Sequence, residues 1–223
     1  CPDRVCRRYP GTRDICRWGG RLQVALAAAG IDPLQIDTLL LTHAHPDHIG
    51  GLAGPLQTPV FRNVQQLFVH EKELAFWRDE TISAGAPDAF KPFFEVARNA
   101  FSAYDDKLVP FREEAILPGI QTVPLFGHTP GHTGYLLGDE KESLLIWGDI
   151  VHFPHIQVAQ PDVTIAFDSD PAAAAAIRSK VLDRAASDNL AVSGMHFNLP
   201  TTGKVIREGN SFALNYDLWS PAV

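Results

Sequence analysis

Four side chains that could bind a metal stand close together in the segment HAHPDH: His43, His45, Asp47 and His48. The segment directly follows residues 38–41, an apolar run that is typical of a buried strand. Imidazole nitrogens and carboxylate oxygens are ligands of Zn²⁺ and related ions. Loops at strand ends are also where rigid scaffolds usually present chemistry. The pattern predicts a site for one or two divalent metals, with a surface histidine cluster as the alternative.

Three further metal donors occur later in the chain: His128 in FGHTPGHT, Asp149 in LLIWGDI and His196 in AVSGMHF. Each donor follows a short apolar run that reads as a strand, so each is expected at a strand end or in the adjoining loop. The repetition of this arrangement favours a metal site over a surface cluster.

The spacing of the first four donors suggests how they are shared between two ions. In an extended loop, residues two apart point to the same side, so we expect His43 and His45 to bind the same ion. His128 is expected to complete the ligands of that ion. Asp47 and His48 then turn toward a neighbouring ion.

We expect His196 to complete the ligands of the second ion, and the two oxygens of Asp149 suit a bridge between both ions. Metal binding lowers the pKa of water from about 15.7 toward about 7, so a hydroxide shared by the ions is the expected nucleophile. Asp47 is placed to pass a proton to the leaving group. The sequence therefore predicts a dinuclear metal hydrolase without a Ser or Cys nucleophile.

The chain has 223 residues, of which 45% are hydrophobic and 20% charged, and its formal net charge is −7. This composition is typical of a soluble globular protein. The acidic balance and the scattered Lys and Arg residues disfavour nucleic acid as a partner. No apolar run approaches the ~18 residues of a membrane helix. We expect a small-molecule substrate, no nucleic-acid or membrane partner, and a cytoplasmic location.

The three cysteines, Cys1, Cys6 and Cys16, all lie near the start of a sequence that begins without Met. An odd number of cysteines in one irregular segment does not define a disulfide framework. We expect unpaired thiols, with a structural metal as the alternative. A periplasmic or secreted location stays open, because a processed or truncated chain can have lost an export signal.

Hydrophobic periodicity predicts that residues 1–20 are irregular and that residues 21–223 form one hydrolase domain. The predicted helices cover 22–29, 71–79, 89–104 and 171–186. The predicted strands cover 36–42, 66–69, 120–125, 134–137, 143–147, 190–193 and a closing hairpin of 205–207 with 212–215. Strands that alternate with helices and are joined partly by hairpins indicate an α/β (α+β layered) fold of stacked sheets with outer helices.

Taken together, HAHPDH, GHTPGHT, the Asp of WGDI and the late His of SGMHF resemble the metallo-β-lactamase superfamily. The resemblance implies an αβ/βα four-layer sandwich with a dinuclear site, usually zinc, with Mn, Fe or Co also open. It assigns the metal ligands to His43, His45, Asp47, His48, His128, Asp149 and His196. Residues 1–20 offer no counterpart of the N-terminal strands, which we expect to be absent or altered.

A narrower resemblance, over residues 22–216, is to methyl parathion hydrolases and their lactonase-like relatives. The segments ELAFW, FFEVARNAF and GDIVHFPHIQVAQPDVTIAFDSDP carry it. It implies that lactones, aryl esters or organophosphate triesters enter an aromatic pocket beside the metals. The expected pocket residues are Trp77, Phe93, Phe94 and Phe197, with core packing as the alternative. The Asp at position 149, where class B β-lactamases carry a Cys, argues against antibiotic hydrolysis.

The other polar residues near the motifs receive separate interpretations. The family pattern makes His132 a partner that orients the ligand loop rather than a ligand, with simple packing as the alternative. His152 and His155 are expected to be solvated loop residues. Asp170, directly before a proline, is expected to cap a helix, with Asp168 orienting the turn before it.

Three other functions stay open at this point. Thioester hydrolases and mononuclear iron dioxygenases that act on persulfides occur on similar scaffolds. A metal-binding domain without turnover is the non-enzyme alternative. A transfer-RNA processing nuclease is disfavoured by the acidity of the chain, and a homodimer is expected only by analogy with relatives.

Overall fold

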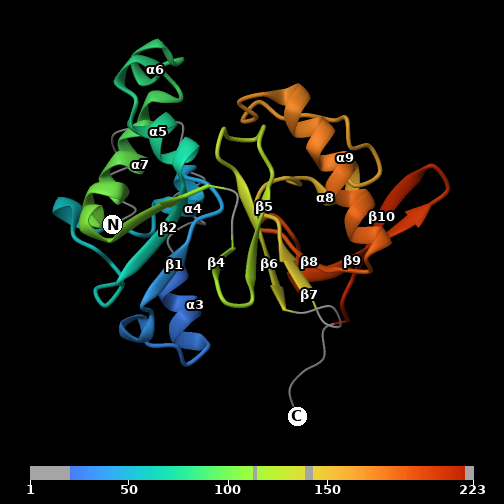
Figure 1. Cartoon of the computed structure of the whole chain (residues 1–223), viewed down its shortest axis with the longest axis horizontal. Helices are drawn as coiled ribbons and strands as arrows, with labels where there is room; N and C mark the ends of the chain where they lie inside the picture. Colours follow the sequence, from blue (N-terminus) through green and yellow to red (C-terminus); the bar gives the residue numbers. More distant parts are fainter. Residues whose placement is uncertain (1–20, 113–114, 139–142, 219–223) are drawn as a thin grey trace. The chain divides into compact units, whose positions relative to one another are not determined.

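The computed structural model describes residues 21–112, 115–138 and 143–218 (Figure 1). The described residues form two compact units. The N-terminal unit holds residues 21–69 and 75–110, and the C-terminal unit holds residues 70–74 and the described residues from Phe111 onward. The predicted irregular segment 1–20, with its three cysteines, lies outside the described residues.

The N-terminal unit contains a sheet with strand order β1-β2-β3, in which β1 and β2 are parallel. Its strands are β1 (Thr38–Leu40), β2 (Gln66–His70) and β3 (Leu108–Phe111). Its helices are α3 (Leu22–Ala28), α4 (Pro46–Ile49), the later part of α5 (Glu71–Arg78), α6 (Glu80–Gly85) and α7 (Lys91–Ala103), with 3-10 turns η2 (Pro33–Gln35), η3 (Pro55–Gln57) and η4 (Asp105–Lys107). The first turn of α5, residues 71–74, belongs to the C-terminal unit. The predicted strand over 36–42 exists but is shorter, and β3 was not predicted.

Helix α7 confirms the predicted helix over 89–104. Pro92 occupies its first turn, where the missing amide proton is not needed. Phe94, Ala97 and Phe101 recur at helical spacing and are buried. Phe94 packs against Trp77 of α5 with ring centroids 4.8 Å apart. The apolar face of α7 therefore holds the end of α5 in place.

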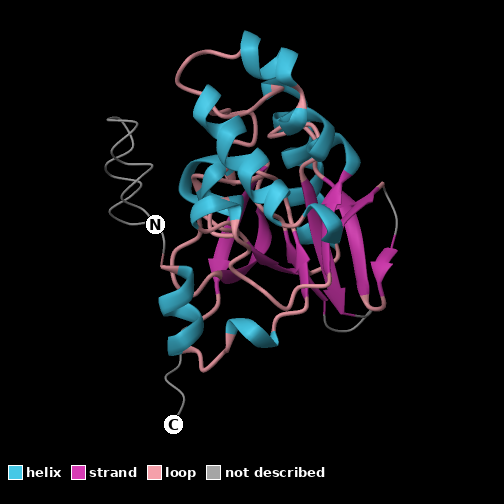
Figure 2. Ribbon diagram, turned by 90° about the vertical axis from the view of Figure 1, so that its left-hand side faces the viewer, coloured by secondary structure: helices cyan, strands magenta, loops and turns pink. Residues whose placement is uncertain are grey.

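The C-terminal unit is built on a seven-stranded sheet with the order β10-β9-β8-β7-β6-β5-β4. The strands are labelled in Figure 1 and drawn in magenta in Figure 2. The pair β7 and β8 is parallel, and the other neighbours are antiparallel. The strands are β4 (Ala115–Leu117), β5 (Ile120–Pro124), β6 (Thr133–Gly138), β7 (Ser143–Ile146), β8 (Ala191–Ser193), β9 (Thr202–Glu208) and β10 (Ser211–Tyr216). All but β4 were predicted to within a few residues, including the closing hairpin.

Two helices accompany this sheet, the short α8 (Pro154–Gln157) and the long α9 (Pro171–Ser187). The Asp170 side chain accepts a hydrogen bond from the backbone amide of Ala173 at 3.0 Å, which confirms the predicted N-cap. Helix α9 packs against β9. Its buried side chains, among them Val181 and Leu182, join the core of the unit.

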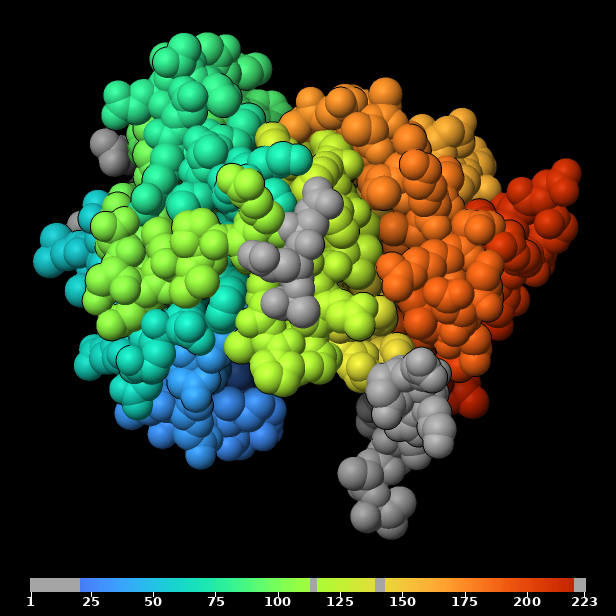
Figure 3. Space-filling view, in the orientation of Figure 1, coloured from blue at the N-terminus to red at the C-terminus, as the bar shows by residue number. Residues whose placement is uncertain are grey.

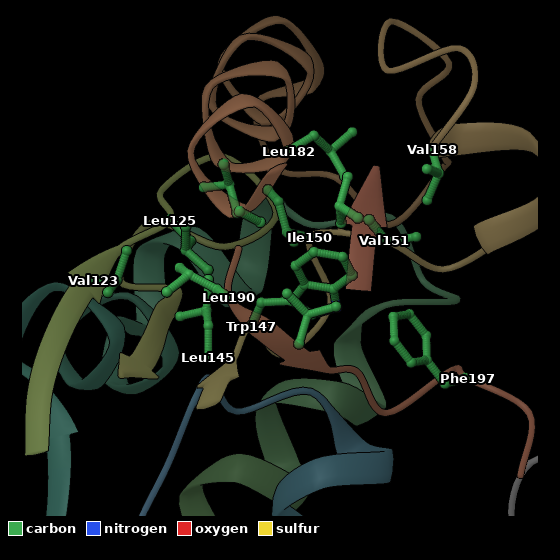
Figure 4. Packing of buried hydrophobic residues seen from close by; sticks show 14 residues of the cluster. Val123, Leu125, Leu145, Trp147, Ile150, Val151, Val158, Leu182, Leu190 and Phe197 are labelled. Carbon is green, nitrogen blue, oxygen red and sulfur yellow. The ribbon is translucent and has the colours of Figure 1, made fainter. Parts of the chain in front are cut away.

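Figure 4 shows that core, in which Trp147 lies among aliphatic side chains from the sheet and from α9. Trp147 and Leu145 are fully buried at the end of β7. Aromatic and aliphatic burial of this kind stabilises the unit by roughly 1.5–3 kcal/mol per side chain. Because Asp149 follows Trp147 by two residues, the core fixes the backbone from which that carboxylate projects.

The predicted α/β class is confirmed, since both units combine sheets with helices. Among the described residues, no helix is both long and apolar enough to cross a membrane.

Gly127, in the loop after β5, offers a test of the packing against α9. Its φ is +135°, and an added Cβ would lie 2.3 Å from the backbone nitrogen of Ala174. We expect the left-handed backbone to cost Gly127→Ala about 1–2 kcal/mol of the free energy of unfolding. Overpacking against α9 should cost a further ~1–3 kcal/mol. Gly119→Ala is the control, because its φ is +75° with no atom within 4 Å of the added Cβ. Equal losses in urea unfolding of the two variants would contradict close packing at Gly127.

Candidate metal centre

The N-terminal unit brings three of its predicted ligand histidines together. The ring centroid of His43 lies 4.0 Å from that of His48 and 4.9 Å from that of His45. The Oγ1 of Thr42 lies 3.2 Å from Nδ1 of His43, which orients this buried ring. The carboxylate of Asp47 lies 3.5 Å from Nε2 of His48.

The backbone of this cluster differs from the predicted extended loop. His45 has extended dihedrals and is the N-cap of α4, but helical structure begins at Pro46. Asp47 and His48 therefore lie on a helical turn, so the alternation of an extended chain does not set their directions. The physical reason is Pro46, whose fixed φ suits the first position of a helix. The expectation of an extended HAHPDH segment was wrong beyond His45.

An aromatic group lies beside His45 within the same unit. The ring of Trp77 is 5.4 Å from that of His45, and the ring of Phe93 is 6.1 Å from it, both edge to face. Trp77 and Phe94 are almost fully buried, whereas Phe93 is partly exposed. The contacts agree with both a pocket wall and core packing for these three residues.

In the C-terminal unit, three imidazole nitrogens converge on one oxygen of Asp149. Its Oδ2 lies 3.0 Å from Nε2 of His196, 3.0 Å from Nε2 of His152 and 3.7 Å from Nε2 of His128. The side chain of Asp149 is only 2% exposed. Imidazole nitrogens gathered around a buried carboxylate form a donor set suited to a divalent cation.

His152 departs from its prediction as a solvated loop residue. Its side chain is 10% exposed and stacks on the ring of His196 with centroids 4.5 Å apart. Ligand atoms of His128, Asp149 and His152 all lie within 4.8 Å of one another, as a shared cation would require. The prediction was wrong because the segment after Asp149 turns back instead of extending into solvent. His155, in contrast, is exposed as expected.

His128 is fully buried, and a second carboxylate orients it. Its Nδ1 lies 2.9 Å from Oδ1 of Asp168, so a proton on Nδ1 leaves Nε2 as the available ligand atom. Burial lowers the pKa of the His128 imidazole, which favours the neutral form that metal binding needs. Burial alone would raise the pKa of Asp168, but its bonds to His128 and Ile165 outweigh this and the net shift is downward.

His132 is held through both ring nitrogens. The backbone amide of Asp149 donates to its Nε2 at 3.1 Å, and its Nδ1 lies 3.0 Å from the carbonyl oxygen of Leu125. Since Nε2 accepts, the proton resides on Nδ1, which donates to that carbonyl. With both nitrogens engaged, His132 orients the backbone of Asp149, in agreement with its predicted supporting role.

Glu73 supports the loop that carries His128, and the sequence did not reveal it. Its Oε2 accepts hydrogen bonds from the Thr129 hydroxyl at 2.7 Å and from the Gly131 amide at 3.0 Å. Glu73 is 1% exposed. A Cβ added at Gly131 would lie 2.4 Å from the backbone nitrogen of Glu73. An acidic residue in the first turn of α5 reads as a helix-dipole partner, so no local signal indicated this contact. No local signal indicated the contact of Asp168 with His128 either, and the sequence analysis assigned Asp168 only to a turn.

Phe197 lies in the core cluster of the C-terminal unit. It is 8% exposed, and its ring packs edge to face against Trp147 and Tyr216 at 5.4 and 5.5 Å. Its assignment to a substrate pocket stays a prediction.

A family model described as the metallo-beta-lactamase superfamily matches residues 10–196. Because the match covers most of the chain, the protein belongs to the metallo-β-lactamase superfamily, as its motifs predicted. The membership, together with the donor sets of both units, supports a metal-dependent hydrolase.

Two of the solved structures that resemble this chain over most of its length illustrate the similarity. One is the hydrolase AbOPH of the beta lactamase superfamily, with a TM-score of 0.84 and 28% identity over 90% of this chain and 71% of that chain. The other is AidC, a dizinc quorum-quenching lactonase in complex with a homoserine product, with a TM-score of 0.83 and 26% identity over the same shares.

Among curated proteins, shorter matches are to ribonuclease Z. The protein of Aeropyrum pernix is 37% identical over 57 residues, which are 26% of this chain and 18% of that protein. The protein of Methanothermobacter thermautotrophicus is 34% identical over 62 residues, which are 28% of this chain and 20% of that protein. The chain thus spans only about a fifth of the length of these relatives.

Replacing His132 tests its role in holding Asp149. His132→Phe keeps the ring shape but leaves the Asp149 amide and the Leu125 carbonyl without this partner. We expect a loss of about 1–3 kcal/mol in the free energy of unfolding and metal binding weaker by about 10–100-fold. Thermal unfolding and a metal titration would measure the two effects. His155→Phe makes the same exchange at an exposed position, so an equal loss there would contradict the assignment.

Proposed function

We propose that the chain is a dinuclear metal hydrolase that cleaves an ester-type bond in a lactone, an aryl ester or an organophosphate triester. The proposal takes residues 21–223 as one hydrolase domain. The proposed metal ligands are His43, His45, Asp47, His48, His128, Asp149 and His196. The observation that carries the proposal is the convergence of imidazoles on the buried carboxylate of Asp149 in a metallo-β-lactamase chain.

The residues present fit the implied metals by their chemistry. Neutral imidazoles and carboxylates suit Zn²⁺, and the same ligands accept Mn, Fe or Co. Zinc is our first choice, since AidC is described as a dizinc enzyme. The buried position of His128 and its partner Asp168 favour a neutral imidazole with a free ligand nitrogen.

When bound, two such ions supply hydroxide at neutral pH and polarise the oxygen of the bond under attack. The chain's own residues position the metal donors and carry the proton. His132 and Asp168 hold the donors in position, which lowers the reorganisation that binding requires. The Asp47 carboxylate is 51% exposed, so it is accessible to carry a proton to the leaving group.

We place lactones first among the substrates. AidC is a lactonase, and its similarity to this chain extends over 90% of the residues. The aromatic side chains of Trp77 and Phe93 beside His45 offer an apolar surface for the organic part of such a substrate. Phe94 backs this surface through its contact with Trp77, and Phe197 is retained as a fourth pocket residue.

RNA hydrolysis is the second candidate, because the local identity to ribonuclease Z reaches 43% over 51 residues. A net charge of −7 works against binding a polyanion. The two candidates therefore differ in the charge of the substrate that the chain can accept.

A chelator-controlled activity screen tests the proposed function. The metal-loaded protein is expected to hydrolyse a lactone, with loss of activity after chelation and recovery on adding Zn²⁺. Aryl ester, phosphotriester, thioester, β-lactam and precursor transfer RNA form the other arms. Asp149→Asn should abolish turnover, whereas His155→Phe, at an exposed position, should retain it. A metal-replete protein that is inert toward every ester and lactone would refute the proposal, and turnover of RNA alone would replace it.

Trp77→Phe tests the proposed pocket without opening a large cavity. Loss of about 1 kcal/mol of apolar contact corresponds to a KM for apolar lactones higher by roughly fivefold. Phe101→Leu is the control, because Phe101 is buried in the same unit on α7 and is not assigned to the pocket. Both variants should lose stability, but only Trp77→Phe should raise KM. An unchanged KM would assign Trp77 to the core alone.

A further inference from the structure

Arg178, in the middle of α9, is fully buried. Removing a guanidinium from water costs several kcal/mol unless its donors find partners. An aliphatic side chain would fill the same space without that cost. The contacts of the Arg178 guanidinium therefore indicate what its charge and its planar donors contribute to the structure.

The guanidinium binds the chain segment that begins directly after Asp149. Its Nε donates to the carbonyl oxygen of Ile150 at 2.5 Å. Its Nη1 donates to the carbonyl oxygens of Pro161 at 2.7 Å and Val163 at 2.8 Å. One side chain thus joins both ends of residues 150–163. Only Arg offers donors in a planar array wide enough for three carbonyls.

The remaining nitrogen of Arg178 faces the partner of His128. Its Nη2 lies 3.8 Å from Oδ2 of Asp168, whose Oδ1 is 2.9 Å from Nδ1 of His128. The other contact of Oδ2 is the backbone amide of Ile165, which donates to it at 3.1 Å. Arg178 therefore touches both the segment following Asp149 and the carboxylate that orients His128.

The side chain of Gln157 links distant parts of the same segment by hydrogen bonds. Its Oε1 accepts from the amides of His152 at 2.7 Å and Phe153 at 3.0 Å, and its Nε2 donates to the carbonyl of Val163 at 3.0 Å. Val163 is thus bound by both Gln157 and Arg178. The hydrogen bonds of Gln157 and Arg178 together fix the backbone of the turn that follows Asp149.

We propose that Arg178 is a positioning residue that fixes the separation of Asp149 and His128, so that metal affinity depends on a side chain that contacts no metal. The proposal rests on the metal site proposed above and adds to it a residue outside the ligand set. If Arg178 only filled the core, its replacement would lower stability and leave metal affinity unchanged.

The test compares Arg178→Lys and Arg178→Gln with Arg184→Gln. Arg184 lies on the same helix, shown in orange in Figure 3, and is 44% exposed. Zn²⁺ affinity is measured by competition with a chromophoric chelator, and the Co²⁺ absorption spectrum reports ligand geometry. Both Arg178 variants are expected to bind Zn²⁺ about 10–100-fold more weakly, with an altered Co²⁺ spectrum. Arg184→Gln should match the wild type.

Thermal unfolding of the metal-free proteins separates stability from affinity. If Arg178→Lys folds and keeps the wild-type Zn²⁺ affinity, the proposal is overturned, whatever its stability. If the Arg178 variants do not fold, Asp168→Asn tests the link to His128 with little change of shape, and an unchanged Zn²⁺ affinity there overturns the proposal as well. A wild-type protein that binds no divalent metal would refute the metal site itself, a result distinct from both.

Discussion

The structure of the candidate centre depends on how the buried carboxylate of Asp149 is accommodated. A carboxylate that is 2% exposed is stable only with polar or cationic partners, because burial without them costs several kcal/mol. Three imidazoles surround one oxygen, and His132 binds the backbone amide of the same residue. Trp147, two residues before Asp149, is fully buried in the core of the same unit. The polar partners of Asp149 and the apolar core next to it in the chain therefore together determine its position.

Sequence periodicity predicted the elements that carry their own signals. Helix α9 has a capping Asp170, a proline in its first turn and buried residues at helical spacing, and its prediction was right to within a residue or two. The closing hairpin of β9 and β10 has a turn glycine, Gly209, with a φ of +59°. Strand β4, which was not predicted, has only three residues and pairs with β5 in an irregular register.

The proposed donors were chosen from residue type and spacing, but the residues that contact them were not predicted. Asp168 contacts His128 across forty positions of sequence, and Glu73 contacts Gly131 across fifty-eight. No local pattern encodes such a contact, because it arises from the way distant segments pack. His152 was misjudged for the same reason, since its burial follows from the turn that Gln157 holds. Candidate metal ligands are therefore easier to propose from sequence than the residues that orient them.

The superfamily hosts more than one hydrolytic reaction, so the fold alone does not select a substrate. In this chain the proposed donors differ in burial and in the number of contacts that hold them. His128 is fixed by Asp168 on its ring and lies between Gly127 and Gly131, whose backbones touch α9 and Glu73 too closely to admit a Cβ. Asp47 instead sits on a four-residue helix with half of its side chain exposed. Rigid buried donors favour affinity, since little order is lost on binding. An exposed carboxylate is accessible for proton transfer, the role proposed for Asp47.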